Sequence, residues 1–158
     1  MLKFFNNYFE EILMVFLLSL MSILIGLQVF MRYVMNDSLT WSEELARYAF
    51  IWATYIGVAC GIKRKSHIAV EALVERFNPF YRHVASIVAN LLFIVFAALV
   101  MKEGYALTVK IFNFGQQSSA MGLPMGWVYM APVVGFGLAI IRLLQSIAAE
   151  VRAMRTGA

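Results

Sequence analysis

The residues best suited to chemistry gather in one short segment, which contains Trp41, Glu43, Glu44 and Arg47. The two carboxylates and the guanidinium stand three and four residues apart, a spacing that allows ion pairs along a helix. Thr40, three residues before Glu43, predicts a capping box in which hydroxyl and carboxylate satisfy free backbone N–H groups. Two interpretations stay open for this cluster. It is either a well-capped helix start or a set of charges that meets another polypeptide.

Elsewhere the chain offers few groups for catalysis or metal binding. Its histidines, His67 and His83, are both expected to be solvated in one loop, and Cys60 lies in an apolar stretch that predicts a buried, inert thiol. The sequence contains no glycine-rich phosphate-binding motif and no metal-spaced set of His and Cys. We therefore expect no enzymatic activity, no cofactor and no metal site.

The composition indicates that the solvent of this chain is lipid. Hydrophobic residues make up 62% of its 158 residues and charged residues 14%, whereas a typical soluble domain has about 25% charged residues. The mean hydropathy is +0.77. The net charge of +4 comes from basic residues that lie between apolar runs, so it indicates membrane orientation rather than binding to nucleic acid.

Four apolar runs are long enough to cross a bilayer, and they predict an all-α integral membrane protein. We expect a single four-span domain over residues 1–158, with spans at about 12–31, 41–62, 81–101 and 124–144. The third helix is expected to continue toward Phe112. Pro132 should kink the fourth span because proline removes a backbone hydrogen bond. Gly135 and Gly137 should permit close contact between helices.

Two segments outside the spans have helical patterns of their own. Residues 1–11 fit either a short interfacial helix or additional turns of the first span. Residues 66–77 place apolar and polar side chains on opposite faces, which predicts an amphipathic helix along the cytoplasmic surface between spans two and three. A basic triplet precedes this segment and is a candidate site for anionic lipid headgroups: Lys63, Arg64 and Lys65.

The distribution of Lys and Arg predicts the orientation in the membrane. The two terminal segments and the 63–83 loop hold nine of these residues, and the other two loops hold four. Both termini are therefore expected in the cytoplasm. Trp41 and Trp127 then fall at the outer interface, where amphipathic rings prefer to lie. Gln28, near the outer end of the first span, is interpreted as a hydrogen-bonding residue between helices.

Several stretches carry a resemblance to a known family. They are QVFMRYV at 28–34, SLTWSEELARY at 38–48, KRKSHIAVE at 63–71 and GLPMGWVY at 122–129. The sequence resembles the small membrane subunit of tripartite ATP-independent periplasmic (TRAP) transporters, the DctQ- or SiaQ-type component. The family often has Asp where this chain has Glu71.

The resemblance implies a multi-pass protein of the bacterial inner membrane, with a large M subunit and a periplasmic substrate-binding protein as partners. It implies sodium-driven import of an organic acid anion, such as a C4-dicarboxylate, sialic acid or another carboxylate. The small subunit would brace an elevator-type large subunit. The candidates for the partner interface are Arg32, Trp41, Glu43, Glu44, Arg47 and Trp127.

Two other functions are compatible with a small, apolar, four-span chain. One is the membrane anchor of a redox enzyme, which the position of the histidines in a loop disfavours. The other is an autonomous homo-oligomeric transporter. No charged residue stands in the middle of an expected span, and ion pathways normally need one, so this alternative is disfavoured too.

Overall fold

The computed structural model describes residues 2–64 and 79–156, whose regular secondary structure is helical apart from one isolated β-bridge between Gln117 and Pro124. The helices are α1 (Leu2–Tyr33), α2 (Thr40–Lys63), α4 (Pro79–Asn113), α5 (Gly126–Tyr129) and α6 (Ala131–Thr156). Within the described residues, four helical segments are long and apolar enough to cross a membrane. The expected all-α, four-helix architecture is confirmed. The amphipathic helix expected at 66–77 lies outside the described residues, as do Lys65 and His67.

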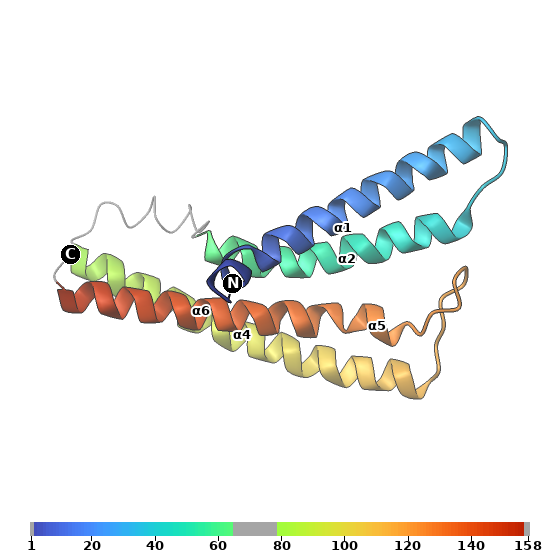
Figure 1. Cartoon of the computed structure of the whole chain (residues 1–158). Helices are drawn as coiled ribbons and strands as arrows, with labels where there is room; N and C mark the ends of the chain where they lie inside the picture. Colours follow the sequence, from blue (N-terminus) through green and yellow to red (C-terminus); the bar gives the residue numbers. More distant parts are fainter. Residues whose placement is uncertain (1, 65–78, 157–158) are drawn as a thin grey trace.

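The long helices lie across the molecule in the order α1, α2, α6 and α4 (Figure 1). α1 packs on α2, α2 on α6, and α6 on α4. The two central helices bury many small side chains, such as Ala53 and Ala59 on α2 and Ala139 on α6. Small residues let helix backbones approach closely, which is how membrane helices gain packing energy when lipid supplies no hydrophobic drive.

Gly135 shows how close this approach is. A Cβ atom added to Gly135 would lie 2.6 Å from both the Cβ and the carbonyl oxygen of Tyr55 on α2. Only glycine fits there, so the expected close contact at Gly135 is confirmed. Gly137 differs, because its added Cβ would meet only the end of the Met101 side chain, with the methyl carbon at an ordinary 3.6 Å.

The two outer helices carry large apolar side chains on their exposed surfaces. Examples are Phe16 and Ile23 on α1 and Leu92 and Leu99 on α4, all more than half exposed. In water such a surface would be an aggregation hazard. On helices of membrane-spanning length, it is a surface for lipid or for the helices of another subunit.

The helix ends refine the expectations from sequence. α1 is continuous from Leu2, so residues 2–11 add turns to the first span. α4 runs to Asn113, which confirms the expected extension of the third helix. α5 ends at Tyr129 and α6 begins at Ala131, and Met130 between them keeps α-helical backbone angles (φ −74°, ψ −19°), so the kink expected at Pro132 stays a prediction. Pro132 has no N–H to donate to the carbonyl of Val128, so one backbone hydrogen bond of a regular helix is missing there.

Candidate functional site: polar clusters at the helix ends

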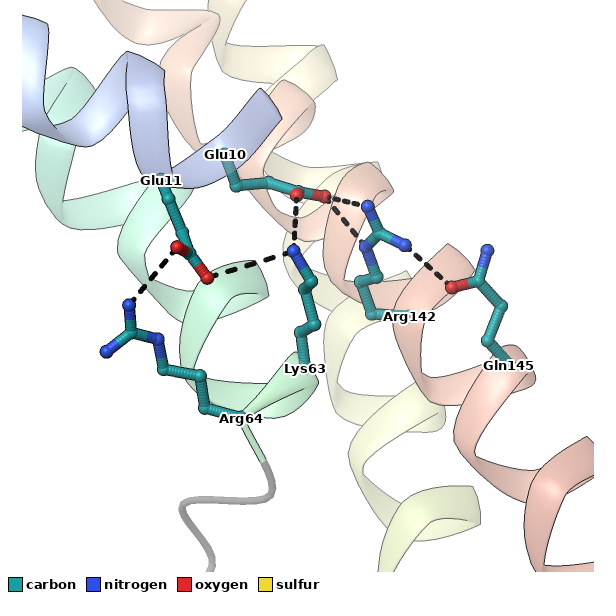
Figure 2. A network of polar contacts seen from close by, with 6 residues as sticks. All are labelled: Glu10, Glu11, Lys63, Arg64, Arg142 and Gln145. Atoms are coloured by element: carbon teal, nitrogen blue, oxygen red, sulfur yellow. Dashed lines mark hydrogen bonds and ion pairs between the residues drawn. The ribbon is translucent and has the colours of Figure 1, made fainter. Parts of the chain in front are cut away.

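Six polar residues meet near the start of α1, the end of α2 and the middle of α6 (Figure 2). We call them the Glu10 cluster: Glu10, Glu11, Lys63, Arg64, Arg142 and Gln145. Nε of Arg142 donates a hydrogen bond to Oε1 of Glu10 at 2.7 Å, and its NH2 group lies 2.5 Å from the same oxygen. NH1 of Arg142 donates to Oε1 of Gln145 at 2.7 Å. Arg142 on α6 therefore contacts Glu10 on α1 and Gln145 on its own helix.

The ion pair between Glu10 and Arg142 is buried. Glu10 is 1% exposed and Arg142 is 8% exposed. A charge taken out of water is tolerated only with a close partner and hydrogen bonds. Oε2 of Glu10 accepts no hydrogen bond, and the ammonium group of Lys63 lies 3.8 Å from it. Among the described helices α1 packs only on α2, so this ionic contact is what ties α1 to α6.

Two of the three basic residues predicted to meet lipid headgroups, Lys63 and Arg64, take part in this cluster. Lys63 lies 3.9 Å from Glu11, and Arg64 lies 3.3 Å from Glu11. The hydrogen bond that Arg64 donates to Glu11 raises the pKa of Arg64 above its usual value. Arg142 was one of the basic residues counted in the C-terminal segment for the membrane orientation, and its buried role was not predicted. The available signal was the acidic pair Glu10 and Glu11, which stands at the membrane end of α1 as Lys63 and Arg64 stand at that of α2.

Gln28 organises a second cluster at the opposite end of α1. Its Oε1 accepts a hydrogen bond from Oγ of Ser42 at 2.7 Å. Its Nε2 donates to Oγ of Ser38 and to Oε1 of Glu43, each at 3.1 Å. Gln28 and Ser42 are both buried. The interpretation of Gln28 as a hydrogen-bonding residue between helices is confirmed.

The same contacts overturn the predicted capping box. The residue that caps α2 is Leu39, which makes no side-chain capping hydrogen bond, and Thr40 is the first helical residue. Glu43 does not reach back to the helix start, because the amide of Gln28 binds its carboxylate. Within the described residues Arg47 forms no salt bridge with Glu43 or Glu44. The capping box and the ion pairs expected from local spacing are therefore not formed: Gln28 on α1 binds Glu43, while Glu44 is bound by Tyr48 and by backbone groups of a distant loop.

Glu44 binds a loop far away in the sequence. Its Oε2 accepts hydrogen bonds from the backbone N–H groups of Ala120 at 2.9 Å and Met121 at 3.1 Å. The hydroxyl of Tyr48 donates to its Oε1. Glu44 thereby holds the 114–125 loop against the start of α2. Sequence reasoning found Glu44 notable but did not find this partner.

The loop has internal order of its own. The N–H of Ser118 donates to the carbonyl of Leu123 at 2.8 Å, beside the bridge between Gln117 and Pro124. Gly122 has a φ of 65°, which favours glycine because a side chain would be strained there. The 114–125 loop is therefore ordered by its own hydrogen bonds and by Glu44. It presents a defined surface next to the start of α2.

The remaining interface candidates are exposed at the same end. Arg32, Trp41, Arg47 and Trp127 all have exposed side chains. The ring of Trp127 packs edge-on against that of Phe112, with 6.0 Å between centroids. This contact fixes one face of the indole and leaves the rest available to lipid or to another protein.

His83 departs from its prediction. It lies in α4 rather than in a loop, and its Nδ1 is 2.6 Å from Oε2 of Glu150 on α6. The expectation of a solvated histidine was wrong, because α4 begins at Pro79 and carries His83 against α6. In the residues that the structure describes, no group of three or more His, Cys, Asp and Glu could hold a metal ion.

The chain thus combines four membrane-length helices with polar groups that are used mainly to join its own elements. A family model for the DctQ component of tripartite ATP-independent periplasmic transporters matches residues 21–153. The chain belongs to this family. As a DctQ-family member it is a small permease subunit of a TRAP transporter and not an enzyme. With its four membrane-length helices it is a multi-pass protein of the inner membrane.

Curated relatives agree with this assignment. A Haemophilus influenzae protein named as a TRAP transporter small permease protein is 31% identical over 150 residues, which cover 92% of each chain. The sialic acid TRAP transporter small permease protein SiaQ of Vibrio cholerae is 29% identical over 82% of this chain and 79% of its own length. The isethionate TRAP transporter permease protein DctMQ of Oleidesulfovibrio alaskensis is 35% identical over 71% of this chain, which corresponds to only 18% of that protein.

Proposed function

We propose that this chain is the scaffold subunit of a sodium-driven, binding-protein-dependent transporter that imports an organic acid anion. In this role it braces a large elevator-type M subunit. Relatives of this DctQ-family chain are named for C4-dicarboxylate, sialic acid and isethionate transport. All three substrates are organic anions, which supports that class of substrate for the complex.

The observation that carries the proposal is the fusion of the small subunit to a larger protein. The sialic acid TRAP transporter permease protein SiaT of Haemophilus influenzae is 24% identical over 99% of this chain, yet the match covers only 24% of SiaT. A single polypeptide that includes a similar region must keep it close to the remainder of the permease. By analogy, this chain has a large membrane partner.

The internal contacts of the chain suit a static support. Gly135 lets α2 and α6 touch backbone to side chain, and the Arg142–Glu10 pair ties α1 to α6. Gln28 joins the far ends of α1 and α2. The charged groups of the two clusters lie toward the helix ends, except Arg142 in the middle of α6, which is paired with Glu10. A rigid, cross-tied bundle with apolar outer faces supports a brace better than a moving carrier.

We assign the protein contacts of this subunit to its outward end. Trp41 and Trp127 are the aromatic candidates for contact with the large subunit or the periplasmic binding protein, since exposed tryptophans often anchor interfaces. Glu44 contributes to this surface indirectly, because it holds the 114–125 loop in place. Glu43 contributes through its hydrogen bond with Gln28. Both termini lie in the cytoplasm in this arrangement, which leaves Arg64 at the inner headgroup level.

Co-purification tests the partnership. The tagged chain is expressed with the large subunit of the same transporter, extracted in mild detergent and eluted from the tag resin. We expect the untagged large subunit to elute with it in a fixed molar ratio. The large subunit of an unrelated transporter serves as the control and should not be retained. Elution of the chain alone, with the large subunit folded in the flow-through, would contradict the proposal.

A further inference from the structure

A groove of about 490 Å³ lies between the end of α1 and the start of α2. Arg32 on α1 and Arg47 on α2 are among its lining residues. Its walls are mainly apolar, with contributions that include Met21, Ile25, Val29 and Phe50. The groove therefore combines two cationic side chains, one from each helix, with a largely apolar surface.

The charges of Arg32 and Arg47 are not neutralised by a carboxylate within the described residues. Both side chains are exposed, and in the part of the chain that the structure describes neither forms a salt bridge. The carboxylate that shares the groove belongs to Glu43, which accepts a hydrogen bond from Gln28. The lining thus has an excess of positive charge. Guanidinium groups match phosphate oxygens well, because their planar N–H donors bind two oxygens at once.

The length of the groove fits one leaflet of a bilayer. Arg32 and Met21 are both on α1, and at 1.5 Å per residue their separation along the helix is about 16 Å. Half of the hydrocarbon core of a bilayer is about 15 Å. A phosphate at the arginines would therefore place an acyl chain along Val29, Ile25 and Met21. A small soluble anion would use the cations but leave these apolar walls uncovered.

From this combination we propose that the groove is a binding site for one glycerophospholipid. Its phosphate contacts Arg32 and Arg47, and one acyl chain lies along the apolar wall of α1. The inference uses only the chain and a lipid, so it stands or falls separately from the transport function.

Native mass spectrometry of the full, delipidated chain tests the headgroup contact. Dioleoylphosphatidylglycerol is titrated into the wild type and into an Arg32→Gln/Arg47→Gln variant. Near a membrane each basic residue contributes about 1 kcal/mol to phospholipid binding, so the double variant should bind the first lipid roughly 10- to 30-fold more weakly. Lys110→Gln is the matched control, because Lys110 is also exposed in the last turn of an outer helix. Equal affinity of the double variant and the wild type would overturn the proposal, and so would an equal loss in the control.

A second variant tests the acyl-chain contact without removing charge. Val29→Trp fills the groove and should abolish the first lipid adduct, whereas Val95→Trp on the exposed surface of α4 should leave it unchanged. Retention of the adduct in Val29→Trp would overturn the assignment. Circular dichroism and elution volume establish that each variant is folded. In the complex with the large subunit the lipid should stay bound, and its loss on assembly would show that a protein segment takes the groove instead.

Discussion

Nε of Arg142 lies 2.7 Å from Oε1 of Glu10, although 132 positions separate the two residues in the chain. The pair is almost completely buried and connects the first helix to the last. No local pattern in the sequence announces it. It is the contact that holds α1 in a defined position relative to α6.

Removing one member of this pair should be costly. Arg142→Met leaves the Glu10 carboxylate buried with only Lys63 nearby, and breaking a buried pair typically costs about 3–5 kcal/mol. The double variant Glu10→Met/Arg142→Met removes both charges and should regain most of that loss. Thermal unfolding of the purified chain in detergent measures both effects. A double variant less stable than Arg142→Met would contradict this account of the pair.

Gly135 should not accept a side chain. Gly135→Ala places a methyl group against Tyr55 and forces α2 and α6 apart, at a cost of about 1–3 kcal/mol. Gly137→Ala is the matched control, since the added methyl group meets only the flexible Met101 side chain. The two variants are compared by thermal unfolding and by crosslinking between α2 and α6. Equal stability in both would show that the helices are not as close as described.

The hydrogen bond between Gln28 and Ser42 should appear as a coupling energy. The single variants Gln28→Leu and Ser42→Ala each remove one partner of the 2.7 Å contact, and the double variant removes both. Hydrogen bonds between membrane helices average about 0.6 kcal/mol and reach about 1.7 kcal/mol in such cycles. We expect a value in the upper part of this range, because both side chains are buried. Strict additivity of the two single variants would exclude a direct interaction.

Glu44 should control the order of the 114–125 loop. Glu44→Gln replaces a carboxylate that accepts two backbone N–H groups with a neutral amide, so the loop should be released from α2. Hydrogen exchange of Ala120 and Met121 should become several-fold faster, with little change in the helices. Glu43→Gln is the control, because Glu43 contacts Gln28 and not the loop. Unchanged protection of both amides in Glu44→Gln would mean that other contacts fix the loop.

The sequence was most informative where hydropathy and local chemistry decide the structure. Long apolar runs predicted the four helices, and a polar residue inside the first run, Gln28, predicted a contact between helices. Spacing failed at the start of α2. Thr40 and Glu43 have the pattern of a capping box, but the Glu43 carboxylate instead accepts a hydrogen bond from Gln28 on α1.

Contacts between segments that are far apart in the sequence could not be predicted from local spacing either. The partners of Glu44 are backbone amides in a loop that no side-chain pattern marks. His83 was expected to be solvated, and its contact with Glu150 was missed because 67 positions separate the two residues. Charged residues near the end of an apolar run were taken to lie outside the membrane span. Arg142 is one of them, but it lies inside α6 and is buried.

Transport by reconstituted components tests the central claim most directly. Proteoliposomes receive the large subunit with or without this chain, the binding protein loaded with its organic anion outside, and an inward sodium gradient. We predict sodium-dependent uptake when both membrane subunits are present and no uptake with this chain alone. Uptake by this chain alone, or equal uptake by the large subunit without it, would contradict its role as the supporting subunit.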